Sequence, residues 1–231
     1  MYNDVMTTTR YEIRVCNSCG LRYPLVEGHP FGTRCPICMG ETRVVLSRKL
    51  IAEPGVPYRV KEETRKNVAV LLDNIRSAWN VGSILRSADG FGFTHAYLCG
   101  ITPTGDNEAV TKTSLGAEDS VPWSYHKDAV RLVKGLKAEG WKVYGLEEDA
   151  RAVPLESDSL PSKIQEQAAS EDPVLQILIL GNEVTGVDPE LLDLCDQIFF
   201  IPMRGEKRSF NVAIAFSIAA YALNAQRRVD I

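Results

Sequence analysis

The sequence predicts an α/β domain with a mostly parallel sheet, preceded by a small cysteine-rich domain. From residue 67 onward, short apolar runs alternate with amphipathic stretches, as strands and helices alternate in a parallel sheet. Before that point, two Cys-x-x-Cys pairs lie in a stretch too short to bury a hydrophobic core. We therefore expect the cysteine-rich domain over 1–46, a linker over 47–66 and the α/β domain over 67–231.

The four cysteines have the spacing of a zinc site. Cys16 and Cys19 form one pair and Cys35 and Cys38 the other, with 15 residues between the pairs. Each pair can place two sulfurs on one ion from a tight turn, and four thiolates leave no position open for a substrate. Zinc would then supply the folding free energy of the domain. We predict a structural zinc in a zinc-ribbon-like domain, with reactive thiols or coincidence as the alternatives.

Charge is distributed unevenly along the chain. Residues 1–66 hold 11 Lys and Arg against 7 Asp and Glu, whereas the whole chain has a net charge of −4. The overall charge therefore gives no sign of a polyanionic partner. Six basic residues surround the cysteines: Arg14, Arg22, Arg34, Arg43, Arg48 and Lys49. They suit contacts with nucleic-acid phosphates, and a solvated basic surface is the alternative.

The elements follow one another in a regular order. The linker contains Pro54, Gly55 and Pro57 and has little apolar periodicity. Strands are expected at 68–72, 96–99, 121–125, 141–146, 174–180 and 198–201. Helices are expected at 81–93, 127–139, 189–194 and 211–225. Segment 149–173 contains three prolines and is expected to be a mobile loop or a poorly packed helix.

Two of these elements are unusually apolar. The strand at 174–180 is nearly continuous in apolar residues, which is typical of a strand buried on both faces. The helix at 211–225 is apolar around most of its circumference, more than one face against a sheet can use. This helix is therefore either fully buried in the monomer or part of a subunit interface.

Several function classes are disfavoured. No apolar run approaches the roughly 20 residues that cross a bilayer, and the first ten residues lack the apolar centre of a signal peptide. We expect a cytoplasmic protein without a membrane partner. The absence of GxGxxG and GxxxxGK[ST] argues against Rossmann dehydrogenases and P-loop nucleotidases. The absence of GxSxG and HExxH argues against triad hydrolysis and catalytic zinc.

Three polar clusters interrupt the apolar strands where a parallel sheet places its ligands, at the carboxyl ends. The first runs from residue 73 to 88 and contains Asn80 and Arg86, the second covers 180–186, and the third covers 201–211. Taken alone, Asn80 could simply cap the helix that follows it, and Arg86 could be a solvated surface residue. The clusters read NxRxxxNxGxxxR, LGxExxG and IPMxGxxxSxNV.

In order and spacing, the three clusters resemble the motifs of the SpoU (TrmH) family of RNA 2′-O-ribose methyltransferases, in the SPOUT superfamily. The resemblance covers about 67–227. It implies an S-adenosylmethionine-dependent enzyme with a carboxyl-terminal trefoil knot, acting as a homodimer on tRNA or rRNA. A non-catalytic RNA-binding protein and an RNA base methyltransferase are the alternatives.

The resemblance also implies roles for individual residues. The implied catalytic residues are Asn80, Arg86, Glu183, Ser209 and Asn211. The implied cofactor-binding residues are Gly181, Ile201, Met203 and Phe210. A guanidinium is almost always protonated, so we expect Arg86 to stabilise the developing alkoxide while the proton leaves to phosphate, water or Glu183. Two positions depart from the family pattern, with Phe210 in place of Leu and Ala213 in place of Ser.

Overall fold

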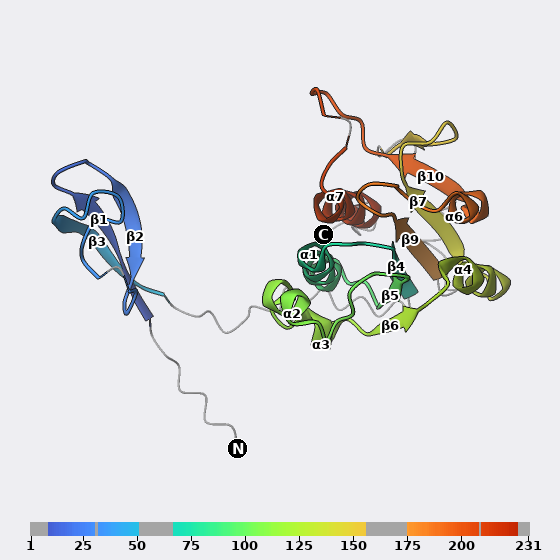
Figure 1. Ribbon diagram of the computed structural model, residues 1–231, viewed down its shortest axis with the longest axis horizontal. Coiled ribbons are helices and arrows are strands. Elements are labelled where there is room, and N and C mark those ends of the chain that lie inside the picture. The colour runs from blue at the N-terminus through green and yellow to red at the C-terminus, as the bar shows by residue number, and fades with distance from the viewer. Residues whose placement is uncertain (1–8, 31, 51–66, 156–174, 208, 226–231) are drawn as a thin grey trace, which may run out of the picture. The chain divides into compact units, whose positions relative to one another are not determined.

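The computed structural model describes residues 9–30, 32–50, 67–155, 175–207 and 209–225. The chain forms two compact units, Met1–Glu62 and Glu63–Ile231 (Figure 1). Most of the predicted linker, from residue 51 to 66, lies outside the described residues. Within the described ranges, no helix combines the length and apolar character that crossing a membrane requires.

The N-terminal unit is a three-stranded antiparallel sheet in the order β2-β1-β3. Its strands are β1 (Thr9–Cys16), β2 (Arg22–Val26) and β3 (Thr42–Leu50). Strand β3 therefore continues four residues past the expected end of the cysteine-rich domain. The segment between β2 and β3 carries the second cysteine pair and forms a short hairpin closed by a bridge between Arg34 and Glu41.

The second unit is built on a seven-stranded parallel sheet in the order β6-β5-β4-β9-β7-β10-β8, which confirms the predicted α/β class with its parallel sheet. The strands are β4 (Asn67–Asp73), β5 (His95–Cys99), β6 (Trp123–His126), β7 (Lys142–Leu146), β8 (Val153–Pro154), β9 (Leu175–Leu180) and β10 (Gln197–Phe200). The central strands β4 and β9 are apolar on both faces because helices cover both faces.

Helices cover the two faces of this sheet in two groups (Figure 1). The helices are α1 (Ala78–Gly90), α2 (Glu108–Ser114), α3 (Ala117–Ser120), α4 (Ala129–Ala138), α6 (Pro189–Leu194) and α7 (Val212–Ala225). Helices α1, α2, α3 and α7 share one face, where Val70 and Leu178 point. Helices α4 and α6 share the other, where Leu71 and Ile177 point.

The structure differs from the prediction at several elements. Helix α1 begins at Ala78 rather than 81, and Ser77, not Asn80, caps it by accepting a hydrogen bond from the Asn80 backbone N–H at 3.3 Å. Helices α2 and α3 were not predicted, because elements of seven and four residues show too little periodicity. Segment 149–155 includes the two-residue strand β8, and the rest of 149–173 lies outside the described residues.

Candidate functional site

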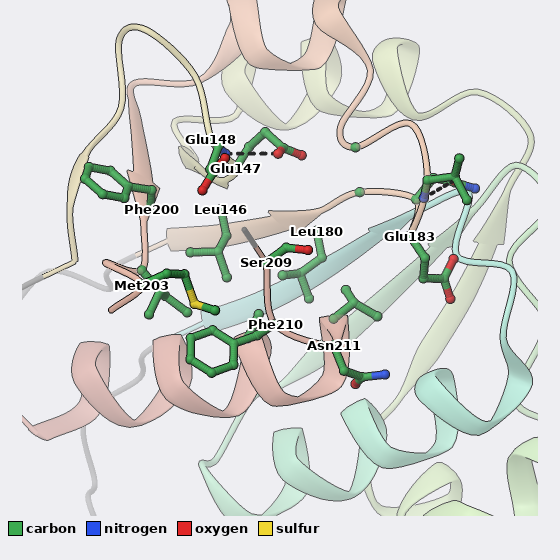
Figure 2. A pocket seen from close by; sticks show the side chains of 17 residues that line it. Leu146, Glu147, Glu148, Leu180, Glu183, Phe200, Met203, Ser209, Phe210 and Asn211 are labelled. Carbon is green, nitrogen blue, oxygen red and sulfur yellow. Dashed lines mark hydrogen bonds between the residues drawn. The ribbon is translucent and has the colours of Figure 1, made fainter. Parts of the chain in front are cut away.

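A cavity of about 480 Å³ lies at the carboxyl ends of β7, β9 and β10, the edge where parallel sheets place ligands. Its walls come from the residues that follow these strands and from the start of α7 (Figure 2). Its apolar lining includes Leu146, Leu180, Phe200, Met203 and Phe210. Polar side chains lie beside this lining, so the cavity can take a ligand with both apolar and polar parts.

All four residues predicted to bind the cofactor line this cavity, namely Gly181, Ile201, Met203 and Phe210. In Figure 2, Met203 and Phe210 lie toward one end of the cavity, and Glu183 and Asn211 toward the other. Two strand ends and the start of α7 thus bring the second and third polar clusters to one place.

Sequence reasoning missed Glu147 and Glu148, which also line the cavity. They directly follow an apolar strand, which is the same signal that identified the three polar clusters. Glu147 joins two loops, because its Oε2 accepts a hydrogen bond from the Val187 N–H at 3.0 Å. Its Oε1 accepts a hydrogen bond from the Glu148 N–H at 2.9 Å. The Glu147 carboxylate therefore holds the end of β7 against the loop that follows β9.

The loop after β9 folds back on itself and requires two glycines. Asn182 and Gly186 exchange backbone hydrogen bonds of 3.0 and 2.9 Å. A Cβ on Gly181 would stand 2.1 Å from the backbone N of Val187. Gly186 has a φ of +74°, and a Cβ there would stand 2.5 Å from the Oε2 of Glu147. Both glycines of the LGxExxG motif are thus explained by backbone geometry.

Glu183 connects this loop to the start of α1. Its carboxylate accepts hydrogen bonds from the backbone N–H groups of Arg76 at 2.9 Å and Ser77 at 3.1 Å, and from Nδ2 of Asn80 at 2.9 Å. Burial alone would raise the pKa of Glu183, but these hydrogen bonds outweigh it, and the pKa lies below the usual value. Glu183 is therefore a stable carboxylate and a weak proton acceptor.

Asn80 and Asn211 extend this contact to the third cluster. Oδ1 of Asn80 accepts a hydrogen bond from Nδ2 of Asn211 at 3.0 Å. Oδ1 of Asn211 accepts in turn from the backbone N–H of Ala213 at 3.0 Å, at the start of α7. Since a carboxylate can only accept, it determines the orientation of both amides. Glu183, Asn80 and Asn211 thus form one hydrogen-bonded chain, called the carboxylate–amide relay below.

Ser209 and Arg86 stand outside this relay. Ser209 lines the cavity, and its hydroxyl points inward in Figure 2. Arg86 is exposed on a different side of α1 from Asn80, and its guanidinium makes no hydrogen bond or ion pair with any residue the structure describes. The structure therefore brings together four of the five predicted catalytic residues and leaves Arg86 apart from them within one chain.

The four cysteines of the N-terminal unit form a compact cluster whose sulfur atoms lie within 4.8 Å of one another. The Sγ atoms of Cys16 and Cys38 are 3.4 Å apart, and those of Cys19 and Cys35 are 3.6 Å apart. Tetrahedral Zn–S bonds of about 2.3 Å place sulfurs about 3.8 Å apart, so the cluster fits one zinc ion. A hydrogen bond from the Cys19 backbone N–H, acting against burial, lowers the pKa of Cys16 to about 6 and favours the thiolate.

Comparisons with known proteins identify the family of this chain. Residues 67–221 match the sequence profile of the SpoU rRNA Methylase family. The chain is 30% identical over 174 residues to a tRNA (guanosine(18)-2′-O)-methyltransferase of Thermus thermophilus, covering 73% of this chain and 81% of the relative. It is 29% identical over 179 residues to a 23S rRNA (guanosine-2′-O-)-methyltransferase of Xanthomonas axonopodis, covering 78% and 67% respectively.

A solved structure gives the same result for the fold. The SpoU methyltransferase AviRb from Streptomyces viridochromogenes, in complex with the cofactor AdoMet, is similar with a TM-score of 0.60 and 22% sequence identity. The similarity covers 81% of this chain and 69% of that one. At this identity, the likeness is one of fold.

Proposed function

This chain belongs to the SpoU rRNA methylase family, and we infer that it is an RNA 2′-O-ribose methyltransferase that uses S-adenosylmethionine. The cavity at the carboxyl ends of the strands and the carboxylate–amide relay carry this inference, because together they bring all three polar clusters to one place. The relatives described above are named for guanosine methylation in tRNA and 23S rRNA, so tRNA or rRNA is the proposed substrate class.

The residues around the cavity suit S-adenosylmethionine. When bound, this cofactor supplies an electrophilic methyl group on a sulfonium sulfur. Gly181 and Ile201 would contact it through backbone groups, and Met203 and Phe210 through apolar packing. Phe210 is 40% exposed, so it offers an accessible apolar wall where the family commonly has Leu. Ala213 is buried against the core and lacks the hydroxyl of the Ser that the family commonly has at this position. Asn211 caps α7 without that hydroxyl, because its Oδ1 accepts a hydrogen bond from the Ala213 N–H.

The relay positions the reacting groups rather than removing the proton. A ribose 2′-hydroxyl is a poor nucleophile while protonated, so the site needs an acceptor or a charge that stabilises the developing alkoxide. Glu183 is held as a weak base by three donors, and we assign it to ordering Asn80 and the loops. Ser209 and Asn211 would orient the ribose, and the proton would leave to phosphate or water.

Arg86 would act across a homodimer interface. Trp79 and Arg86 are seven residues apart on α1, and Ile214 and Tyr221 are seven apart on α7, so each pair lies on one side of its helix. Trp79, Ile214 and Tyr221 are 61%, 52% and 56% exposed. The two helices are neighbours, joined by a 2.9 Å hydrogen bond between Ser87 and a serine of α7. We propose that a second copy covers these exposed side chains and that Arg86 serves the partner's cavity.

Mixing two inactive variants tests this arrangement. Arg86→Ala and Glu183→Gln would each abolish most methyl transfer. If Arg86 acts across the interface, a mixed dimer contains one complete site, because each subunit supplies what the other lacks. Mixing should therefore restore activity, and no recovery from verified mixed dimers would show that Arg86 acts within its own chain or not at all.

The activity itself is tested by cofactor binding and product analysis. Calorimetry should detect S-adenosylmethionine binding, and mass spectrometry of nucleosides from treated total RNA should detect a 2′-O-methylated nucleoside. No binding at millimolar cofactor would refute the enzyme, and a methylated base would assign it to base methylation. Binding without any transfer would favour a non-catalytic RNA-binding protein.

We also propose that the N-terminal unit is a zinc ribbon and that the α/β unit contains the family's trefoil knot. The four-cysteine cluster supports the first. The second rests on the membership of residues 67–221 in the family. Elemental analysis should give one zinc per chain, and a crystal structure that includes 156–174 would test the knot.

A further inference from the structure

The sheet of the N-terminal unit has two faces of different character. Residues paired across antiparallel strands point to the same face, so the register assigns each side chain. On one face, Glu12 of β1 is paired with Leu25 of β2 and Ser47 of β3. On the other, Ile13 is paired with Pro24 and Leu46.

The first face, called the covered face, lies under the hairpin that follows β2. Thr42 donates a hydrogen bond to the carbonyl of Thr33, and the Tyr23 hydroxyl donates to the carbonyl of Arg34 at 3.0 Å. A cavity of about 270 Å³ on this side is lined by Glu12 and Glu27, among others. Arg14 also belongs here, where it is buried and bonded to Glu12 and Thr42.

The second face, called the open face, forms a grid of three rows. The rows, each written β2-β1-β3, are Arg22-Val15-Arg43, Pro24-Ile13-Leu46 and Val26-Tyr11-Arg48. Val26 and Leu46 are 40% and 39% exposed, and the three arginines are exposed. On the central strand, β1, the side chains of Tyr11, Ile13 and Val15 are partly exposed. A bulge in β3 opposite Ile13 and Arg14 places Arg43 on this face.

Charge divides between the same two faces. The open face carries three arginines and no carboxylate. The three carboxylates that the structure describes in this unit lie elsewhere. Glu12 and Glu27 line the covered-face cavity, and Glu41 is 3.9 Å from the guanidinium of Arg34. An apolar centre with an aromatic ring therefore faces outward, flanked by three arginines that form no ion pair with a described residue.

We propose that the open face binds an unpaired segment of the RNA substrate, with bases on Tyr11, Ile13 and Val15 and phosphates at the arginines. This inference rests on the proposed function. Bases stack on aromatic and apolar side chains, and guanidinium groups bind phosphate. Residues 67–231 carry 15 Lys and Arg against 23 Asp and Glu, so the α/β unit needs help to hold a polyanion. Of the six basic residues near the cysteines, three thus belong to the binding surface.

Two triple variants of the full chain test this assignment. The first, Arg22→Ala/Arg43→Ala/Arg48→Ala, removes three charges from the open face. The matched control, Arg10→Ala/Arg34→Ala/Lys49→Ala, removes three charges elsewhere in the same unit. Arg10 and Lys49 are paired on the covered face. Equal zinc content would show that each variant keeps the cysteine cluster.

Binding of a fluorescent oligouridylate, measured over a range of salt concentrations, distinguishes the two variants. Losing three phosphate contacts with a single strand should reduce the slope of log affinity against log salt by roughly 2. The control should keep the slope of the parent protein. Tyr11→Ala should weaken binding roughly 10-fold, and Tyr11→Phe should retain it, because stacking needs the ring and not the hydroxyl.

Three results would overturn the proposal. The open-face variant could behave like its control, or the parent could bind an RNA duplex as tightly as the oligouridylate. A third such result is a larger radius of gyration of the RNA-free open-face variant in solution scattering, which would show that the α/β unit covers the open face in the parent. Cofactor binding and methyl transfer by the parent are measured alongside. If the parent protein neither binds cofactor nor transfers methyl groups, the proposed function is refuted. If the parent does both and one of the three results above is found, only the inference about the open face is refuted.

Discussion

The two units of the chain maintain their folds by different means. The α/β unit buries large apolar side chains on both faces of its sheet, and Leu71, Ile179 and Phe199 have no exposed surface. In the described part of the N-terminal unit, the buried apolar side chains are Cys16 and Cys35, both proposed zinc ligands. One unit is stabilised by hydrophobic burial, and we propose that the other depends on a bound zinc ion.

This difference explains why the candidate active site lies where it does. The relay joins loops that begin at β4, β9 and β10, and these strands are anchored in the core. Rigid anchoring keeps the side chains of the relay in a fixed geometry. The N-terminal unit offers an exposed face instead, which suits binding rather than chemistry.

The largest effect should follow removal of the metal. Stripping zinc with a chelator, or the substitution Cys35→Ser, should unfold the N-terminal sheet, because zinc binding is worth roughly 10 kcal/mol or more in small domains. All three tryptophans lie in the α/β unit, so their fluorescence should stay native. Amide exchange should show loss of protection in β1–β3 alone. The control Cys195→Ala should retain its zinc, and joint unfolding of both units would contradict the separation.

The converse change should destabilise the α/β unit alone. Leu178→Ala removes a buried side chain of β9 and leaves a cavity in the core, which should cost about 2–5 kcal/mol, measured by urea unfolding followed by tryptophan fluorescence. Zinc content should be unchanged. Val44→Ala in the N-terminal unit, at a side chain that is 43% exposed, should change stability by no more than about 0.5 kcal/mol. Similar losses for the two variants would mean that the units do not differ as described.

Arg86→Ala should separate chemistry from binding within the α/β unit. Methyl transfer should fall roughly 10²-fold or more in single-turnover assays, while cofactor affinity stays near that of the parent. Arg86→Lys should recover little, because an ammonium group cannot reproduce the forked contacts of a guanidinium. Arg131→Ala, at an exposed arginine on α4, is the matched control. A parent-like rate for Arg86→Ala would remove it from the mechanism.

The smallest effect concerns the pH dependence of stability. The pKa of Glu183 is lower in the folded chain than its usual value of 4.5. Its ionised form therefore stabilises the fold above that value, and the contribution is lost as the pH falls through the lower folded pKa. Glu183→Gln should destabilise the α/β unit at neutral pH, and its difference from the parent should shrink in acid. A difference that stays constant with pH would show that the charge contributes nothing.

Much of the α/β unit could be predicted from its sequence. Strands β4 and β9 are apolar on both faces, and their neighbouring elements alternate regularly, which indicates a parallel sheet. Polar clusters directly after such strands indicated the ligand edge, and seven of the predicted site residues line the cavity. The same signal would have identified Glu147 and Glu148. Helices α2 and α3 were missed because short helices have little periodicity to detect.

The sequence alone could not predict which side chains lie on which face of the N-terminal sheet. Local sequence signals place six basic residues near the cysteines without assigning them to different faces. Strand pairing and one bulge assign Arg22, Arg43 and Arg48 to the open face, and burial assigns Arg14 to the interior. A single-residue shift in register exchanges the faces of a strand, so no count of nearby charges could distinguish them.

By itself, the sequence determined which segments form the main strands, where the polar clusters lie and how the cysteines are spaced, because periodicity and spacing are local properties. Only the tertiary structure decided the role of Asn80. Its sequence position also suited a helix cap, but Ser77 has that place, and the Asn80 amide contacts Glu183 and Asn211. These partners lie 103 and 131 residues away. Contacts of that range depend on which strand ends become neighbours, and strand order follows from packing of the whole chain.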